Sequence, residues 1–324
     1  MLAGYDIIAQ IYKGRRSAIF RALRSRDQQP VILKTPITNF PIAEHIARLR
    51  HEFALGSTLA DPHIILYHAF EDSPDGPFLV AEDFDAVALV HLIPHDGFEL
   101  TAFLHIAIQL ARGLEAMQRA GIMHKNINPS NIALNAETLT AKFIDFSAAS
   151  RLTREPQQVR HLHRLEGTLA YMAPEQTGRM QQQVDSRADM YALGVTFYQM
   201  LTGSLPFQSD NLLELVHAHL AVTPTAIEAS HPHVPRMVAT IIAKQLAKHP
   251  DERYQSAYGL RQDLEACSTQ WMERGDVDDF PLARHDRPVG WQLSHKLYGR
   301  EHQVHTLMEA LERVALGHTE LLLV

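Results

Sequence analysis

A lysine and a glutamate stand where they could form an ion pair beside a phosphate group. Lys34 closes the short apolar run at residues 31–34, and Glu52 lies in a stretch whose apolar residues recur at helical spacing. A lysine that reaches toward phosphate needs an acidic partner to hold it, and Glu52 is placed to be that partner. The alternative is two solvated surface charges, which is the usual fate of these residue types. Taken alone, the two residues leave both interpretations open.

Several polar runs follow one another further along the chain. They read HKNINPSN at 124–131, FIDFS at 143–147, GTLAYMAPE at 167–175, DMYALG at 189–194 and DERY at 251–254. Phosphoryl transfer requires a clamp for the triphosphate, charge to neutralise it, metal ligands, and a group that orients the attacking hydroxyl. Each run is a modest signal by itself, but their order and spacing together form a strong one.

In this order, the runs resemble the landmarks of eukaryotic-type serine/threonine protein kinases, with the bacterial branch the most similar. VILK at 31–34 resembles the VAIK strand, HKNINPSN resembles the catalytic loop HRDLKPxN, FIDFS resembles the DFG turn, and GTLAYMAPE resembles the end of the activation segment. Thr168 supports the serine/threonine class over the tyrosine class. The resemblance covers residues 1 to about 267.

The resemblance implies an α+β, bilobal protein kinase fold. We expect a small five-stranded β lobe with one helix at residues 1–84, and a larger α-helical lobe at 85–267. The residue pattern agrees, since strand-like runs precede residue 84 and helical patterns dominate after residue 97. The expected helices of the large lobe lie near residues 103–117, 187–201, 211–220, 234–246 and 256–267.

The resemblance also implies a site for ATP and Mg²⁺. Asn131 and Asp145 would supply the oxygen ligands for Mg²⁺, which accepts few protein ligands. The expected nucleotide-binding residues are Gly14, Ile19, Lys34, Glu52, Ala81 and Glu82. Ala81 aligns with the gatekeeper of the interlobe hinge, where a small side chain leaves room behind the adenine. Asp189, Glu175 and Arg253 are expected to hold the lower lobe together and not to touch substrate.

The glycine-rich loop of the family is only partly kept. The family pattern GxGxxGxV aligns with YKGRRSAI at 12–19, so Gly14 alone remains of the three glycines. Glycine serves there because backbone N–H groups must approach the phosphates without a Cβ in the way. Nucleotide binding should therefore be weakened and not abolished.

The catalytic loop departs further from the family. Asn126 stands where the family places its catalytic aspartate, and an amide cannot accept the proton of a substrate hydroxyl at neutral pH. Asn128 stands where serine/threonine kinases carry a lysine against the γ-phosphate. The sequence predicts a regulatory pseudokinase that binds Mg·ATP, and the alternative is an active, slow serine/threonine kinase. A small-molecule phosphotransferase of the aminoglycoside-kinase type shares a similar catalytic loop but lacks the segment seen here at 167–175.

Composition and charge limit the kinds of partner and the cellular compartment that we expect for this protein. The 324 residues carry a formal net charge of −7, which argues against a nucleic-acid partner. A single cysteine, Cys267, excludes an internal disulfide framework and fits a reducing compartment. No signal-peptide pattern opens the sequence, and no run of about eighteen apolar residues is present to span a bilayer. We expect a cytoplasmic protein without membrane contact.

The end of the sequence has a different character. Residues 268–296 are irregular and acidic in part, which predicts a linker. Residues 297–324 resemble the entry into a signal-transduction ATPase domain, ending before any phosphate-binding loop. The alternative is an ordinary helix and strand packed on the kinase lobe. The favoured interpretation is a kinase-like module whose partners are ATPase, sensor and histidine kinase domains of a larger parent protein, with the protein substrate or partner unknown.

Overall fold

The structure is a computed structural model that describes residues 4–14, 17–37, 42–73, 76–151, 169–179 and 182–288. The chain divides into two compact units, Met1–Val289 and Gly290–Val324. All described residues belong to the first unit, so the expected ATPase-like segment at 297–324 lies outside them.

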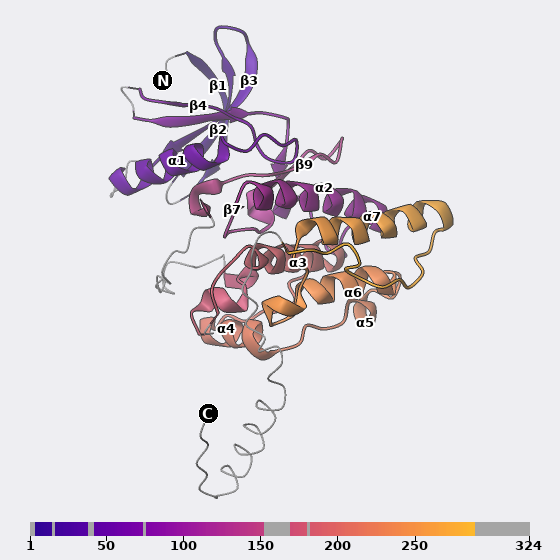
Figure 1. Cartoon of the computed structure of the whole chain (residues 1–324). Coiled ribbons are helices and arrows are strands. Elements are labelled where there is room, and N and C mark those ends of the chain that lie inside the picture. The colour runs from indigo at the N-terminus through magenta and orange to yellow at the C-terminus, as the bar shows by residue number, and fades with distance from the viewer. Residues whose placement is uncertain are drawn as a thin grey trace, which may run out of the picture. The chain divides into compact units, whose positions relative to one another are not determined.

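The small lobe is an antiparallel sheet with one helix beside it (Figure 1). Its strands run in the order β1-β2-β3-β5-β4. Their bounds are β1 Tyr5–Lys13, β2 Ser17–Arg24, β3 Gln29–Pro36, β4 Tyr67–Glu71 and β5 Phe78–Glu82, and helix α1 is Ile42–Gly56. The expected five-stranded lobe with a single helix is confirmed.

One face of this sheet carries a buried apolar cluster, and the other face carries Lys34. Successive residues of a strand point to opposite faces, and in β3 Val31 and Leu33 are fully buried in a small cluster on one face. Lys34 therefore points to the other face, toward α1 and the large lobe. The buried residues of β3 fix the strand in the small lobe, and the Lys34 ammonium lies on the opposite face of the sheet.

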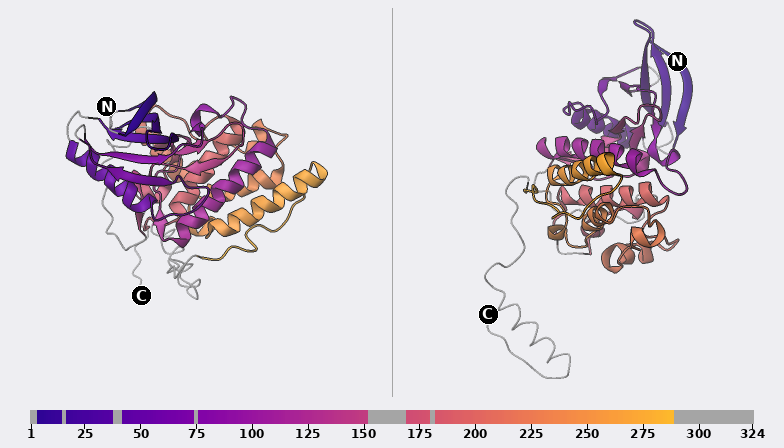
Figure 2. Two further views of the ribbon diagram at one scale, coloured as in Figure 1. Left: turned by 90° about the horizontal axis from the view of Figure 1, so that it is seen from above. Right: turned by 90° about the vertical axis from the view of Figure 1, so that its right-hand side faces the viewer.

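The large lobe is helical, and Figure 2 shows it from two further directions. Its helices are α2 Leu100–Arg119, α3 Arg187–Thr202, α4 Leu212–Ala221, α5 Ile227–Ser230, α6 Arg236–Gln245 and α7 Ala257–Arg274. Helix α3 is buried along almost its whole length, including polar residues such as Arg187 and Asp189. In the described part of the chain, no helix has the length and apolar character needed to cross a membrane.

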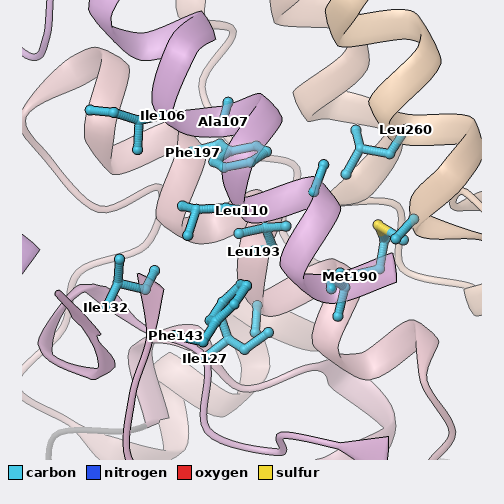
Figure 3. Packing of buried hydrophobic residues seen from close by; sticks show 14 of the residues in the cluster. Ile106, Ala107, Leu110, Ile127, Ile132, Phe143, Met190, Leu193, Phe197 and Leu260 are labelled. Carbon is cyan, nitrogen blue, oxygen red and sulfur yellow. The ribbon is translucent and has the colours of Figure 1, made fainter. Parts of the chain in front are cut away.

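The core of the large lobe forms where α2 and α3 meet (Figure 3). Residues at helical spacing on α2, among them Ile106 and Leu110, are fully buried. Phe103 of α2 meets Phe197 of α3 edge to face, with ring centroids 5.5 Å apart. Phe143 belongs to the same cluster, so the strand that leads to Asp145 is fixed on this core.

Short strands carry the polar runs of the sequence. They are β6 Val87–Ala88, β7 Ile122–Met123, β8 Ile132–Leu134, β9 Ala141–Phe143 and β10 Ser150–Arg151. Strands β6, β8 and β9 form one sheet, and β7 pairs with β10. The loops between them are therefore held at both ends by ladder hydrogen bonds.

The segment after residue 267 differs from the expected linker. Helix α7 continues to Arg274 and ends at Gly275, whose φ of +69° suits a helix C-terminus. Beyond it, the Ala283 N–H donates to Asp263, and Asp286 accepts hydrogen bonds from Gln255 and Ser256. Residues 268–288 thus pack on the large lobe through these hydrogen bonds and through scattered apolar side chains such as Val277 and Phe280, whose lack of a regular period hid the contact in the sequence.

Candidate functional site

Lys34 and Glu52 form a buried ion pair between β3 and α1. The Lys34 Nζ lies 2.7 Å from Glu52 Oε2 and 3.2 Å from Asp145 Oδ1. The Glu52 side chain is 2% exposed, so it contacts the lysine and not solvent. The solvated alternative is thereby excluded for both residues, and the ammonium links the small lobe to the turn that follows β9.

In this trio mutual attraction outweighs burial for Lys34 and Asp145, whereas burial raises the pKa of Glu52 to about 7. Burial alone would lower the pKa of Lys34, but the Asp145 and Glu52 carboxylates raise it above its ordinary value. Burial also opposes the charge of Asp145, yet the Lys34 ammonium and hydrogen bonds from Ser147 lower its pKa to about 2. Asp145 is therefore an ionised carboxylate, which is the form that binds a hard cation.

Asn131 and Asp145 are brought together by one strand pair. Asn131 immediately precedes β8, Asp145 follows β9, and the antiparallel register matches Ile132 with Phe143. The Ile144 N–H also donates to the Asn131 carbonyl oxygen over 3.0 Å. Asp145 has a φ of +62°, and its side chain accepts from the Ser147 N–H. Paired amide and carboxylate oxygens fit Mg²⁺, so these residues could hold the ion.

An amide cluster occupies the catalytic loop. The Asn128 Nδ2 donates to the Asn126 carbonyl oxygen at 3.0 Å and to Asn126 Oδ1 at 3.2 Å. The Asn131 Nδ2 donates to the same carbonyl over 2.9 Å, which leaves Asn131 Oδ1 as the ligand atom. With its Oδ1 turned to Asn128, Asn126 offers the site an N–H donor where a base would offer an acceptor.

Asp189 fixes the backbone of this loop from below. Its carboxylate accepts the N–H groups of His124 at 2.7 Å and of Lys125 at 2.8 Å. Lys125 has a φ of +62°, a conformation that is uncommon outside glycine and that these two bonds hold in place. Burial raises the pKa of Asp189. Asp189 is thus a structural residue, as expected.

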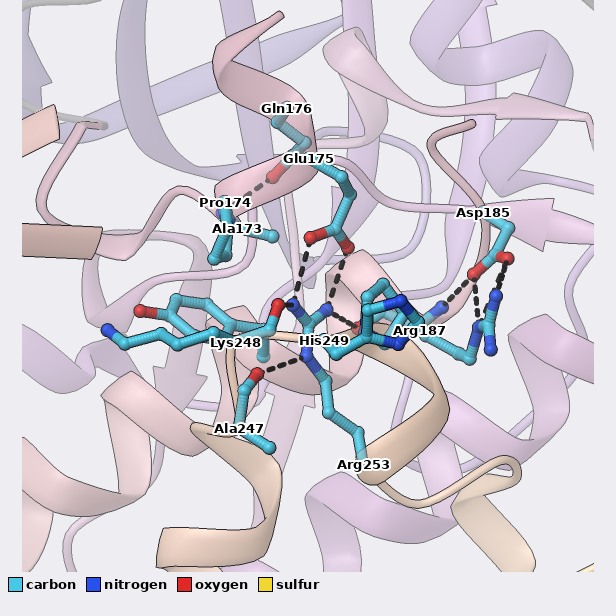
Figure 4. A network of polar contacts seen from close by, with 12 residues as sticks. Ala173, Pro174, Glu175, Gln176, Asp185, Arg187, Ala247, Lys248, His249 and Arg253 are labelled. Carbon is cyan, nitrogen blue, oxygen red and sulfur yellow. Dashed lines mark hydrogen bonds and ion pairs between the residues drawn. The ribbon is translucent and has the colours of Figure 1, made fainter. Parts of the chain in front are cut away.

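Glu175 and Arg253 form the second expected structural pair (Figure 4). The guanidinium and carboxylate meet in a bidentate arrangement, with N–O distances of 2.7 and 2.9 Å. Both side chains are essentially fully buried, at 0% and 1% exposed. The expectation that Arg253 is the buried partner of Glu175 is confirmed.

The remaining residues that we expect to bind the nucleotide lie on strands β2 and β5 and in the β1–β2 turn of the small lobe. Gly14 forms the β1–β2 turn, where its N–H donates to the Ser17 carbonyl. Ile19 pairs with Lys34 across β2 and β3, and Ala81 pairs with Ile32 across β3 and β5. Glu82 ends β5. Its side chain accepts from Lys142 Nζ at 2.6 Å and from the Leu66 N–H at 2.8 Å. Thr168 lies outside the described residues.

One residue of the site was missed by sequence reasoning. The Tyr67 hydroxyl donates to Glu52 Oε1 over 2.9 Å, so both oxygens of the Glu52 carboxylate have partners. The available signal was indirect, because Gly56 follows Glu52 by one helical turn and leaves space for a large ring.

A buried histidine supports the end of the activation segment. His219 of α4 is 1% exposed, and its Nδ1 lies 2.8 Å from the Tyr191 hydroxyl. Burial, with the nearby Lys248 ammonium, lowers the pKa of His219 to about 4. Leu169 and Met172 pack with Phe207 against the same helix.

This histidine gives a pH-dependent stability. In the unfolded chain His219 takes up a proton near its ordinary pKa of 6.5, whereas the folded protein resists protonation down to about pH 4. The unfolded state therefore binds more protons in this window, and the free energy of unfolding falls as the pH falls from 6.5 to 4. The expected loss is about 2–3 kcal/mol at the acid end.

Urea unfolding at pH 7 and pH 4.5 checks this. His219→Asn, whose amide can replace Nδ1, should lose less stability on acidification than the wild type. His217→Asn, on the exposed side of the same helix, is the control. Equal acid sensitivity of the wild type and His219→Asn would contradict the assignment.

Comparisons with known proteins identify a family and several relatives of this chain. A family model described as "Protein kinase domain" matches residues 5–271. The chain is 28% identical to hybrid signal transduction histidine kinase G of Dictyostelium discoideum, over 70% of this chain and 9% of that protein. It is 31% identical to a probable serine/threonine-protein kinase of Streptomyces coelicolor, over 81% and 40%. It is 30% identical to the serine/threonine-protein kinase PknB of Mycolicibacterium smegmatis, over 74% and 38%. The chain thus spans well under half the length of these relatives.

Proposed function

The chain belongs to the protein kinase family, as a eukaryotic-type serine/threonine kinase domain, and from this premise we propose that it is a regulatory pseudokinase. It binds Mg·ATP between its lobes, and its transfer of phosphate to serine or threonine is weak or lost. The observation that carries this proposal is the contrast between an assembled Lys34–Glu52–Asp145 trio and an amide at position 126.

The nucleotide half of the proposal rests on charge and orientation. Lys34 is held by two carboxylates at the inner end of the site, from which its ammonium can reach the α- and β-phosphates. Asp145 and Asn131 supply the oxygen atoms that would hold Mg²⁺. A bound Mg²⁺ would neutralise part of the negative charge of the phosphates. Family members use the same residue types at the matching positions of their motifs.

The transfer half rests on what the catalytic loop lacks. Asn126 presents an amide whose Oδ1 already accepts from Asn128, so it has no base to offer an incoming hydroxyl. Asn128 brings no positive charge to the γ-phosphate. Positioned acid–base groups contribute about 10²–10⁴-fold to rate, so their loss leaves slow residual transfer at most.

Binding of Mg·ATP is tested by calorimetric titration of the chain and of Lys34→Met. A hydrogen bond to a charged group is worth about 1.5–3 kcal/mol, so Lys34→Met should weaken binding by about 10–100-fold. Asp145→Asn should remove the difference in affinity between ATP with and without Mg²⁺, because the ionised ligand is gone.

Lys244→Met is the matched control, since Lys244 donates to the Glu252 carbonyl of the large lobe, away from the site. Its affinity should equal that of the wild type. If the wild-type chain bound no Mg·ATP, or if Lys34→Met bound it equally well, the nucleotide half would be wrong. Robust wild-type transfer that Asp145→Ala abolishes would instead favour an active kinase.

The setting of the domain is part of the same proposal. One relative is named a hybrid signal transduction histidine kinase, and this chain covers 9% of it, which supports a module within a larger signalling protein. Residues 297–324 would then begin an ATPase domain, after a junction near residues 289–296. The lone, buried Cys267 fits a cytoplasmic location.

A further inference from the structure

Tyr67 of β4 covers the last turn of helix α1. Gly56 is the final residue of α1, and a Cβ built on it would lie 2.3 Å from Cε2 of the Tyr67 ring. Only glycine therefore admits the ring at this place. Glu52 precedes Gly56 by four residues and lies on the same helix face, one turn earlier. The ring rests on Gly56, and its hydroxyl points back along the helix to the carboxylate.

The Tyr67 hydroxyl gives the second oxygen of the Glu52 carboxylate a hydrogen-bond partner. Tyr67 donates to Oε1 at 2.9 Å, while Lys34 takes Oε2 at 2.7 Å. Tyr67 is only 6% exposed, so this hydrogen bond is shielded from water and is stronger than the same bond at the surface. Burial and the neighbouring Glu52 charge raise the pKa of Tyr67 well above its usual range, and the hydroxyl keeps the proton that it donates.

The same ring touches the turn that carries Asp145. Tyr67 meets Phe146 edge to face, with centroids 6.4 Å apart, and Phe146 in turn packs on His124 at 4.9 Å. Phe146 directly follows Asp145 and is fully buried. Tyr67 thus contacts both the partner of Lys34 and the neighbour of the metal-ligand aspartate. His51 supplies a separate tie between α1 and this segment, through the Ala149 carbonyl at 2.7 Å.

We infer that Tyr67 is a positioning residue, which acts with Gly56 to hold α1 in the place where Glu52 engages Lys34. The inference rests on the proposed Mg·ATP site. In this protein the inward position of α1 is built in by a hydroxyl–carboxylate bond and does not depend on Lys34 alone. Nucleotide affinity should therefore depend on a tyrosine that itself lies behind Glu52 and does not reach the phosphates.

The test is Tyr67→Phe in the full chain, which keeps the ring and removes only the hydroxyl. Hydrogen exchange of the apo protein should speed up by about tenfold in the last turns of α1, and Mg·ATP affinity should fall by about fivefold to tenfold. In a Glu52→Leu background, which has no acceptor for the hydroxyl, the same change should alter affinity by less than about twofold, because the two residues act as a unit. Tyr198→Phe, which removes another buried hydroxyl that donates to a carbonyl, should change neither quantity.

Three outcomes decide the matter. Unchanged α1 exchange in Tyr67→Phe would overturn the inference and leave His51 as the tie that holds the helix. Equal losses of affinity in the wild-type and Glu52→Leu backgrounds would also overturn it, since Tyr67 would then act through general packing. If the wild-type chain bound no Mg·ATP, the proposed function would fail, while faster α1 exchange in Tyr67→Phe would still support the positioning role.

Discussion

Replacing Asn126 with aspartate is expected to raise phosphoryl transfer by about 10²–10⁴-fold over the wild-type chain. The loop is ready to receive the carboxylate, because the atom that faces Asn126 Oδ1 is a donor, Asn128 Nδ2. An aspartate would keep this bond with one oxygen and offer the other to a hydroxyl. The backbone should not move, since two amide groups and the Asp189 carboxylate fix the loop independently of the side chain at position 126.

The measurement is transfer of radiolabelled γ-phosphate to the chain itself and to a serine-rich acceptor protein. Asn128→Asp is the matched control, because it adds the same charge two residues away from the base position and should give no rescue. Adding Asp145→Ala to Asn126→Asp should abolish the gained signal. A wild-type rate that Asn126→Asp leaves unchanged would show that position 126 does not limit transfer.

The site could be assigned from the sequence wherever a motif has a fixed order along the chain. Lys34, Glu52 and Asp145 were assigned in this way, and the structure places them in contact. Tyr67 could not be found by this route, because its partners Glu52 and Gly56 lie on another element and no local pattern marks a cross-element hydrogen bond. The amide orientation of Asn126 was equally hidden, since it depends on which atom of Asn128 faces it.

The fold was predictable where buried apolar residues recur at the spacing of a helix or a strand. The apolar spacing of α2 and the alternation in β3 predict those elements because each buries one face. The segment after residue 267 failed for the opposite reason. Its apolar residues, among them Val277 and Phe280, pack on the large lobe, but they are scattered among acidic and polar residues without a period, so the sequence is indistinguishable from a linker until its partners, such as Asp263, are known.

The largest loss of stability is expected from Arg253→Met. All five N–H groups of the guanidinium are used, two on Glu175 and one each on the carbonyls of Arg187, Lys248 and Ala247. Removing the arginine strands the Glu175 carboxylate in the interior. Breaking one partner of a buried pair costs about 3–5 kcal/mol, and this free energy should appear as a lower urea midpoint with an unchanged slope.

The double variant Glu175→Leu/Arg253→Met separates two explanations of that loss. If the stranded charge dominates, the double variant should be more stable than Arg253→Met, because no ion remains buried. Recovery should be incomplete, since three backbone carbonyls still lack their donor. Arg261→Met is the control: its partly exposed bridges to Glu115 and Glu265 should be worth less than about 1 kcal/mol. Were Arg253→Met no more costly than Arg261→Met, the buried pair would not be what holds the end of the activation segment on the large lobe.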